Sequence, residues 1–307
     1  MTRRVALVGL GKIAQDQHRP ALAKSNRFTL VAAASPEGEG GGVPVFPDVT
    51  SLLASGLPID ALALCQPPQY RYDAAYAALQ AGKHVLLEKP PGATTLEVDA
   101  LTELAAQRGR TLFCAWHSRF APGVEPARAW LAGRRVREVS IAWLEDVREW
   151  HPGQQWIWEP GGMGVFDPGI NALSIATRLL SAPLRVRGGK LDFPSNCDTP
   201  IAARLDLATP GGIRVRTQFN WLKVGPPVWD IVVHTDDGTL QLSRGGAALA
   251  IDGVEQPVEP EGEYAALYAR FAALIDAGQS DADASPLRTV ADAFLRCARR
   301  RVAAFRP

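Results

Sequence analysis

The most constraining feature of the sequence is a glycine pattern near its start. Gly9-Leu-Gly11-Lys-Ile-Ala14 follows directly after Val5–Val8, a continuous apolar run that is typical of a buried strand. In a strand–turn–helix unit the first glycine makes the tight turn, the second lets a diphosphate approach the backbone, and the alanine allows close helix–strand packing. The pattern predicts a dinucleotide site, and the alternative is a purely structural turn. The predicted contacts are Gly9, Gly11, Lys12 and Ile13.

The first half of the chain alternates between two kinds of segment. Apolar runs predict strands over 5–8, 28–34, 61–65, 84–87 and 111–114, and helices are predicted over 70–80 and 94–107. Thr94-Thr-Leu-Glu97 is typical of a capping box, and Gly109 suits the end of that helix. The alternation predicts an α/β fold with a doubly wound, Rossmann-type parallel sheet.

The second half has a different pattern. Strands are predicted over 139–142, 184–186, 201–207, 213–221, 229–235 and 240–243, several of them with alternating apolar residues, and two helices close the chain. This order predicts an α+β domain with a large, open, mostly antiparallel sheet. We expect a dinucleotide-binding domain over 1–118 and a substrate and oligomerisation domain over 119–307. The last helix is a candidate for returning to the first domain.

Composition limits the partners and the compartment. Lys and Arg total 33 against 32 Asp and Glu, so no basic excess favours nucleic acid or an anionic membrane, and no segment is apolar enough to span a bilayer. The arginines of 296–301 are predicted to lie at a solvated helix end. Four widely spaced cysteines predict free thiols in a reducing cytoplasm and no metal site. A small molecule is the expected partner.

The end of the second strand bears on the choice of cofactor. An acidic residue there favours NAD, whereas an arginine favours NADP. The segment reads Ser35-Pro36-Glu37, and no Arg or Lys follows Ser35 before residue 71. Glu37 would repel a 2′-phosphate, so NAD is predicted. NADP stays open because Lys12 or Arg19 could approach the phosphate.

Two further strand ends carry polar side chains. Cys65-Gln66-Pro67 follows the third strand and Glu88-Lys89 follows the fourth, at the edge where open α/β sheets bind ligands. These residues are predicted to line the cofactor, with Lys89 able to hydrogen-bond a reacting hydroxyl. The alternative for Lys89 is a surface lysine before a turn.

These motifs resemble a known family. The G-x-G-x-x-A start, the Glu-Lys-Pro tripeptide at 88–90 and the sheet-rich second half are similar to the glucose–fructose oxidoreductase, inositol dehydrogenase and MocA family, and the resemblance covers essentially the whole chain. Within it, the stretches 9–18, 88–93, 116–118, 145–148, 150–162 and 166–171 most resemble the bacterial L-arabinose/D-galactose 1-dehydrogenase group.

The resemblance implies specific roles. Lys89 and Asp167 match the catalytic lysine and aspartate, and Asn171 stands where the wider family has a histidine. Asp167 and Asn171 are four residues apart, so they project from one helix face. Proton transfer then falls to Lys89 or Asp167, a choice that the sequence leaves open. The residues implied to line a sugar pocket are His117, Glu145, Trp150, His151 and Trp229.

The residue types of that pocket make physical sense for a sugar. Carboxylates, imidazoles and amides match pairs of hydroxyls, and flat aromatic rings cover C–H faces. Trp143 lies inside a predicted strand and is read as core, whereas Trp150 and His151 stand beside Pro152-Gly153 and are read as pocket. A structural and a functional role are equally open for His18.

The expected reaction is oxidation of an aldopyranose, D-galactose, L-arabinose or D-fucose, at C1 to the aldonolactone. A nicotinamide accepts the hydride and Lys89 lies at O1, held by Asp167. Two alternatives are an NAD-dependent glycosidase, which yields no net NADH, and a dinucleotide-binding regulator without catalysis. The family resemblance also implies a homo-oligomer that pairs through the open sheet.

Overall fold

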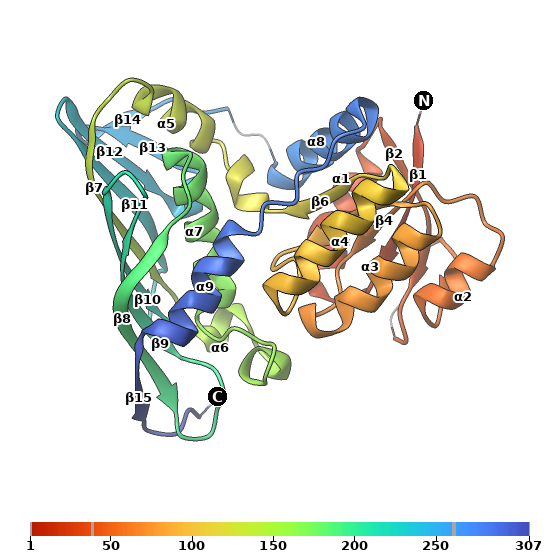
Figure 1. Cartoon of the computed structure of the whole chain (residues 1–307), viewed down its shortest axis with the longest axis horizontal. Helices are drawn as coiled ribbons and strands as arrows, with labels where there is room; N and C mark the ends of the chain where they lie inside the picture. Colours follow the sequence, from red (N-terminus) through yellow and green to blue (C-terminus); the bar gives the residue numbers. More distant parts are fainter. Residues whose placement is uncertain (1, 38–39, 260–261, 307) are drawn as a thin grey trace. The chain divides into compact units, whose positions relative to one another are not determined.

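The computed structural model describes residues 2–37, 40–259 and 262–306 and separates into two units (Figure 1). Unit 1 comprises Met1–His117 and Gly262–Ala284, and unit 2 comprises Ser118–Glu261 and Ser285–Pro307. The first break lies one residue before the expected boundary at 118. The segment that returns to unit 1 carries the penultimate helix and not the last one, which corrects the expectation for the last helix.

Unit 1 is built on a six-stranded parallel sheet with the order β3-β2-β1-β4-β5-β6. This is the order of a dinucleotide-binding Rossmann fold, so the α/β prediction is confirmed. The strands are β1 (Arg3–Val8), β2 (Phe28–Ala34), β3 (Val45–Phe46), β4 (Ala61–Leu64), β5 (His84–Glu88) and β6 (Leu112–Ala115). The helices are a π-helical turn (Ala14–His18), α1 (Arg19–Ala23), α2 (Val49–Ala54), α3 (Arg71–Gln80), α4 (Thr95–Arg108) and the returning α8 (Glu263–Ala277).

Local sequence signals fix the ends of α4. The Thr94 hydroxyl accepts a hydrogen bond from the Glu97 backbone, and the Glu97 carboxylate accepts one from the Thr94 backbone in return. Gly109 ends the helix in the left-handed conformation with φ of +60°. The predicted capping box and C-cap glycine are both confirmed.

Helix α8 packs on the sheet of unit 1 although its sequence lies far from it. Phe271 stacks on Phe28 of β2 with ring centroids 5.5 Å apart and on Phe113 of β6 at 6.0 Å. Buried apolar residues of α8 therefore complete the core of unit 1, which explains why the chain returns there.

Unit 2 contains a nine-stranded sheet with the order β14-β13-β12-β11-β7-β10-β9-β8-β15. The β7–β10 and β8–β15 pairs are parallel and the other neighbours are antiparallel, as a mostly antiparallel sheet requires. The strands are β7 (Val136–Leu144), β8 (Arg185–Pro194), β9 (Ala202–Ala208), β10 (Arg214–Asn220), β11 (Val228–Thr235), β12 (Gly238–Ser243), β13 (Ala248–Ile251), β14 (Val254–Gln256) and β15 (Ala298–Val302).

Helices cover one face of this sheet. α5 (Val124–Leu131), α7 (Phe166–Leu180) and α9 (Ser285–Arg296) pack against its strands, and the short α6 (Val147–Trp150) follows β7 (Figure 1). The last helix α9 belongs here because Phe294 contacts Phe166 and Phe193, and the Thr289 hydroxyl donates to the Leu184 carbonyl. The opposite face is polar: β10 alternates buried Val215 with exposed residues such as Arg216.

The arginine run at the C-terminus corrects a prediction. Arg296 ends α9, but Arg299 to Arg301 lie in β15, a strand that pairs in parallel with β8. Arg300 is held there by Asp192, at 2.7 Å and 2.8 Å. The run of basic residues predicted a helix end. The structure instead places most of it in a strand, because an acid on the neighbouring strand pairs with one of the arginines.

Candidate functional site

The glycine loop of unit 1 has the geometry that phosphate binding requires. Gly9 has φ of +84°, and a Cβ there would lie 2.7 Å from the backbone nitrogen of Gln66, so only glycine fits. By contrast, no atom lies within 4 Å of a Cβ built on Gly11. Ala14 is fully buried where the helical segment begins. The loop therefore packs tightly on the sheet at its first glycine and leaves space for a diphosphate at its second.

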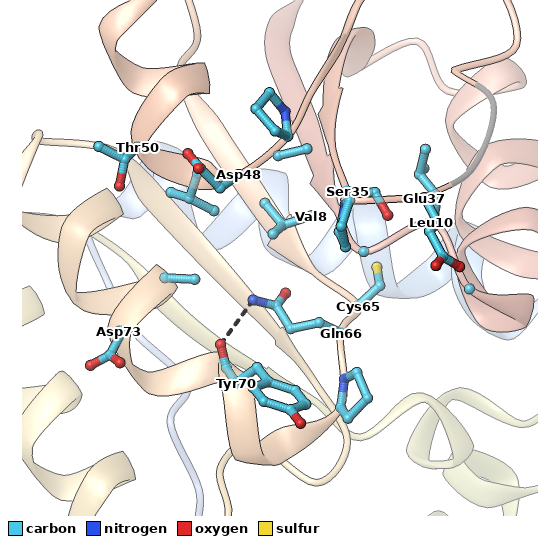
Figure 2. Close-up of a pocket in the computed structure, with 18 of the residues that line it drawn as sticks. Val8, Leu10, Ser35, Glu37, Asp48, Thr50, Cys65, Gln66, Tyr70 and Asp73 are labelled. Atoms are coloured by element: carbon cyan, nitrogen blue, oxygen red, sulfur yellow. Dashed lines mark hydrogen bonds between the residues drawn. The ribbon is translucent and has the colours of Figure 1, made fainter. Parts of the chain in front are cut away.

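A cavity of about 850 Å³ continues from this loop along the ends of β1, β2 and β4 (Figure 2). Seven of the predicted cofactor contacts line it: Gly9, Gly11, Ser35, Pro36, Cys65, Gln66 and Pro67. Lys12, Ile13, Glu88 and Lys89 are not among its lining residues. Gln66 extends into the cavity and donates to the Tyr70 carbonyl at 3.1 Å. The volume and the open space at Gly11 suit a dinucleotide.

The cavity also has walls that the sequence analysis missed. Asp48 and Thr50 come from the start of α2, and Tyr70 and Asp73 from the start of α3. The short strand β3 brings α2 to this place, and its two residues are too few to give a recognisable pattern. Asp48 could have been found as an N-cap, since its carboxylate accepts from the Ser51 backbone at 2.7 Å.

Internal partners hold the two cations considered for a 2′-phosphate. Lys12 pairs with Asp16 one helical turn later. Arg19 donates to the side chain of Gln15 at 3.1 Å and to the carbonyls of Gly40 and Gly41 at 2.9 Å and 3.0 Å. Glu37 lines the cavity beyond β2. Among the described residues that line the cavity, Glu37, Asp48 and Asp73 are acidic and none is basic.

A buried arginine organises the segment that carries Lys89. Arg71, at the start of α3, donates to the backbone carbonyls of Gln66, Glu88 and Pro90. The Lys89–Pro90 peptide bond is cis, and Lys89 is half-buried. One guanidinium therefore ties the ends of β4 and β5 together. Sequence reasoning missed Arg71, because a single arginine at a helix start carries no distinguishing signal.

The Glu88 side chain lies in a buried network apart from the lining of the cavity. Its Oε1 accepts from Tyr264 Oη at 2.6 Å and lies 3.2 Å from His18 Nε2, and its Oε2 accepts from the Lys89 backbone nitrogen at 2.6 Å. Burial by itself raises the pKa of this carboxyl. The hydrogen bond to His18 and the charge of His18 oppose burial, and the net result is a pKa lowered from 4.5 to about 2. Glu88 is therefore an ionised group inside the protein.

His117 lies at the end of unit 1. Its Nδ1 is 2.5 Å from the Glu263 carboxylate, and its ring stacks on Tyr264 at 5.3 Å. The carboxylate at Nδ1 orients the ring, because the other ring nitrogen must then point away from it.

In unit 2 a second buried carboxylate collects three N–H donors. Glu145 follows β7 and is 2% exposed. Its Oε2 accepts from Trp229 Nε1 at 2.8 Å, and its Oε1 accepts from Trp221 Nε1 at 3.2 Å and lies 3.0 Å from His151 Nε2. The structure thus brings together Glu145, His151 and Trp229 of the predicted set. It adds Trp221, which the sequence analysis left in a strand.

Helix α7 brings Asp167 and Asn171 to the same place. Asp167 stands in its first turn, 3% exposed, with Oδ2 3.6 Å from His151 Nδ1. Within the described part of the chain, two buried atoms here make no hydrogen bond: His151 Nδ1 and Asn171 Oδ1. A ligand with hydroxyl groups can supply donors to both.

Aromatic rings form the outer wall of this cluster. Trp150 is 39% exposed and meets Trp229 edge to face, with centroids 4.9 Å apart. Trp143 is buried and stacks on the same ring at 6.1 Å. Trp143 is therefore core, as predicted, whereas Trp150 is the accessible ring and its role in a pocket stays a prediction.

The described part of the chain has neither a metal-binding cluster nor a membrane-spanning helix. Over residues 2–37, 40–259 and 262–306, no group of three or more His, Cys, Asp or Glu side chains could hold a metal ion. No helix in that part of the chain is long and apolar enough to cross a membrane. The four cysteines are buried, and none of them forms a disulfide.

Comparisons with known proteins identify the family of the chain. The model of the GFO/IDH/MocA family, described as an oxidoreductase family with an NAD-binding Rossmann fold, matches residues 3–115. The chain is 49% identical to galactose 1-dehydrogenase of Pseudomonas fluorescens over 302 residues, 98% of each chain. The crystal structure of D-galactose-1-dehydrogenase from Rhizobium etli superposes with a TM-score of 0.95 at 52% identity, covering 99% of this chain and 98% of that one. A 3-ketoreductase from Actinomadura kijaniata, 20% identical, shares the fold with a TM-score of 0.84 over 98% of this chain and 100% of its own.

Proposed function

The chain belongs to the GFO/IDH/MocA oxidoreductase family, and from this premise we propose that it oxidises the C1 hydroxyl of an aldopyranose to the aldonolactone. It is an NAD(P)-dependent sugar dehydrogenase. The observation that carries this proposal is the cluster in unit 2: the buried Glu145 carboxylate accepts from two indole N–H groups and lies beside His151, and neither His151 Nδ1 nor Asn171 Oδ1 makes a hydrogen bond in the described part of the chain. Such a cluster suits the hydroxyl pairs of a sugar.

The chain's own residues divide the work of the reaction. When bound, the nicotinamide accepts the hydride from C1. We assign Lys89 to O1, where it takes the hydroxyl proton as general base. Asp167 and Asn171 orient the sugar, and Trp150 covers one C–H face. The glycine loop and the cavity that starts there hold the dinucleotide through Gly9, Gly11 and Gln66.

D-Galactose and L-arabinose are the proposed substrates, with D-fucose as a further one. Their pyranose forms share configuration at C2, C3 and C4 and differ at C5, so a site that binds the shared hydroxyls accepts all three. Glucose is the C4 epimer of galactose and would leave buried polar groups unpaired. The test is a panel of aldoses assayed by NADH absorbance. Equal rates on glucose and galactose would contradict the stereochemical argument, and no rate on any aldose would contradict the substrate class.

The same assay separates the two alternative functions. A glycosidase that uses NAD transiently would release free sugar without net NADH, and a regulator would show no turnover at all. A stoichiometric yield of NADH per sugar oxidised is the expected result.

NAD is the proposed cofactor. Glu37 lines the cavity beyond β2, where its carboxylate would repel a 2′-phosphate, and Lys12 and Arg19 are engaged by internal partners. The ratio of kcat/KM for NAD and NADP tests this assignment. A clear preference for NADP would mean that Arg19 leaves the carbonyls of Gly40 and Gly41 to bind phosphate.

We also propose a cytoplasmic homo-oligomer. Four buried free thiols suit a reducing compartment. The face of the unit 2 sheet that lacks helices offers a broad polar surface, with ion pairs such as Arg216–Glu138 at 3.3 Å, on which a second copy could pair. Sedimentation of the full chain tests the assembly, and a monomer at micromolar concentration would contradict it.

A further inference from the structure

The Glu88 carboxylate has every donor it needs inside unit 1. It accepts from Tyr264 Oη at 2.6 Å and from the Lys89 backbone nitrogen at 2.6 Å, and His18 Nε2 lies 3.2 Å away. Its side chain is 2% exposed. Both of its oxygens are thus occupied by protein donors. Through Oε2 it holds the backbone of Lys89, the residue assigned to the proposed chemistry.

His18 supplies the charge that balances this carboxylate. Tyr264 and a backbone amide are neutral donors, and an ionised carboxylate buried without a countercharge is costly. The His18 ring is fully buried, with Nδ1 2.8 Å from Tyr268 Oη. Burial lowers the pKa of His18, but Cys65, Tyr268 and the hydrogen bond to Glu88 raise it well above 6.5 overall. Both ring nitrogens then donate, one to Glu88 and one to Tyr268.

We propose that His18 is a positioning residue for Lys89: its ring, 3.2 Å from the Glu88 carboxylate, fixes that carboxylate, which fixes the Lys89 backbone and thereby aims the lysine. The proposal rests on the role of Lys89 proposed above. The arrangement explains why the returning helix α8 belongs to unit 1. Tyr264 and Tyr268 are four residues apart on α8, so both project toward His18 and close the network.

A double-mutant cycle tests whether His18 acts through Lys89. The four enzymes are the wild type, His18→Leu, Lys89→Ala and the double variant. Their kcat for D-galactose with NAD is expressed per mole of NADH-binding sites, which removes unfolded protein from the comparison. We expect His18→Leu to lower kcat about tenfold when Lys89 is present and less than twofold when it is absent. A tenfold loss in both backgrounds would overturn the proposal, because His18 would then act independently of Lys89.

A second readout does not depend on turnover. Acetic anhydride labels lysine side chains, and mass spectrometry compares Lys89 with Lys24, an exposed lysine of the same unit. We expect His18→Leu to change the Lys89-to-Lys24 labelling ratio at least threefold. An unchanged ratio would overturn the proposal. If the ratio changes but no aldose is oxidised, the proposed function fails and the positioning role stands.

A milder variant covers the case in which His18→Leu does not fold. Tyr264→Phe deletes one donor to Glu88 and keeps the ring, so we expect a two- to fivefold loss of kcat and a smaller labelling change in the same direction. Tyr76→Phe is the matched control, since Tyr76 is 44% exposed on α3 and is not among the residues that line the cavity. Equal behaviour of the two tyrosine variants would contradict the network.

Discussion

Two carboxylates, Glu88 in unit 1 and Glu145 in unit 2, are equally buried and differ in what surrounds them. Each is 2% exposed, follows or ends a strand, and lies within 3.2 Å of an imidazole nitrogen. Around Glu88 both nitrogens of His18 have partners, Glu88 itself and Tyr268. Around Glu145 the imidazole of His151 has one nitrogen without a hydrogen bond in the described part of the chain.

On this difference rests our proposal that Glu88 belongs to a structural network and Glu145 to a sugar site. Buried polar atoms are almost always satisfied, so a network that is complete within the protein serves to hold the backbone. His151 Nδ1 and Asn171 Oδ1 make no hydrogen bond in the described part of the chain, and we propose that sugar hydroxyls donate to them. Variants in the two places should therefore change different quantities: Glu88 neighbours should affect stability and kcat, and Glu145 neighbours should affect sugar binding.

The closed network is the set of Glu88, His18, Tyr264 and Tyr268, whose hydrogen bonds are complete within unit 1. The largest expected effect lies next to it, at Lys89. Lys89→Ala removes the proposed base, and general base catalysis contributes about 10²- to 10⁴-fold, so kcat should fall by that range. NADH affinity should stay within twofold, as measured by fluorescence titration. Lys24→Ala, an exposed lysine of the same unit, is the control. Turnover surviving within a fewfold of wild type would remove Lys89 from the mechanism.

The open network is the set of Glu145, Trp221, Trp229 and His151 in unit 2, in which His151 Nδ1 makes no hydrogen bond in the described part of the chain. It gives the next effect. Glu145→Gln replaces one acceptor oxygen by a donor and turns it toward the N–H groups of Trp221, Trp229 and His151. We expect kcat/KM for the sugar to fall about 100-fold, in line with the loss of a charged hydrogen-bond acceptor. The NADH affinity should not change. Glu255→Gln, on the edge strand β14 with a side chain that is 76% exposed, should behave like wild type. A matching loss of NADH affinity would show a general folding defect instead.

Asn171→Ala gives the sharpest contrast between activity and stability. Asn171 Oδ1 makes no hydrogen bond within residues 2–37, 40–259 and 262–306, so its removal should cost little stability. Sugar kcat/KM should fall about tenfold, since a sugar hydroxyl loses its acceptor. Thermal unfolding and steady-state kinetics measure the two quantities. Ser174→Ala, on the same helix, is the matched variant. The Ser174 hydroxyl donates to the Asn171 carbonyl at 2.7 Å, so its removal should lower the stability and leave the sugar kcat/KM close to wild type.

The parts of the fold that were predictable depend on local chemistry. Gly9 and Gly11 directly follow an apolar strand, and Thr94 with Glu97 starts a helix, so in both cases the signal lies within a few neighbouring residues of the sequence. The parts that were missed depend on distant partners. β15 needs Asp192 to accept Arg300, and α8 joins unit 1 because Phe271 packs between Phe28 and Phe113.

The candidate sites show the same division. Residues in linear motifs were found by their spacing: Cys65 to Pro67 line the cavity of unit 1 and Asp167 lies 3.6 Å from His151 in unit 2, while their roles stay predictions. Arg71 and Trp221 escaped notice because their roles come from contacts with backbone carbonyls and with Glu145, which no spacing in the sequence reveals. Glu88 belongs to the Glu-Lys-Pro tripeptide, but only the structure shows that its side chain points into the protein, where it accepts from Tyr264.

The closed network should also have a pH signature that the open one lacks. The pKa of Glu88 is lowered to about 2 from 4.5, so its stabilisation is present above pH 4.5 and is lost as pH falls from 4.5 toward 2. The pKa of His18 is raised, so its stabilisation is complete below pH 6.5 and is lost as pH rises through the folded value. The pair should therefore stabilise the fold most between pH 4.5 and 6.5.

Denaturant unfolding of wild type and His18→Gln from pH 3 to 10 measures this signature. The difference in unfolding free energy between them should be largest between pH 4.5 and 6.5 and should shrink on both sides. His84 is partly buried and its pKa is lowered to about 4, which adds an acid dependence of its own between pH 6.5 and 4. That contribution is common to both proteins and cancels. A difference that is constant across pH would mean that His18 is neutral in the fold.

The smallest expected effect tests how far the open network extends. The C-terminal Phe305 packs on Trp158 at 5.0 Å, and Trp158 meets edge to face with Trp221, the donor to Glu145. The Asn196 side-chain amide accepts from the Phe305 backbone nitrogen at 2.8 Å and donates to the Phe305 carbonyl at 2.9 Å. Phe305→Ala should therefore loosen the indole that holds the carboxylate.

We expect the sugar KM of Phe305→Ala to rise two- to fivefold, with kcat and NADH affinity close to wild type, because packing around Glu145 changes and no hydrogen-bonding group is lost. Steady-state kinetics with D-galactose measure it. Leu295→Ala, which deletes an 85% exposed side chain of α9 in the same unit, is the control. An unchanged KM would confine the sugar site to the direct partners of Glu145. A loss of NADH affinity would instead mean that the C-terminal contact supports the whole protein, and the contrast between the two carboxylates would then not extend beyond their own hydrogen bonds.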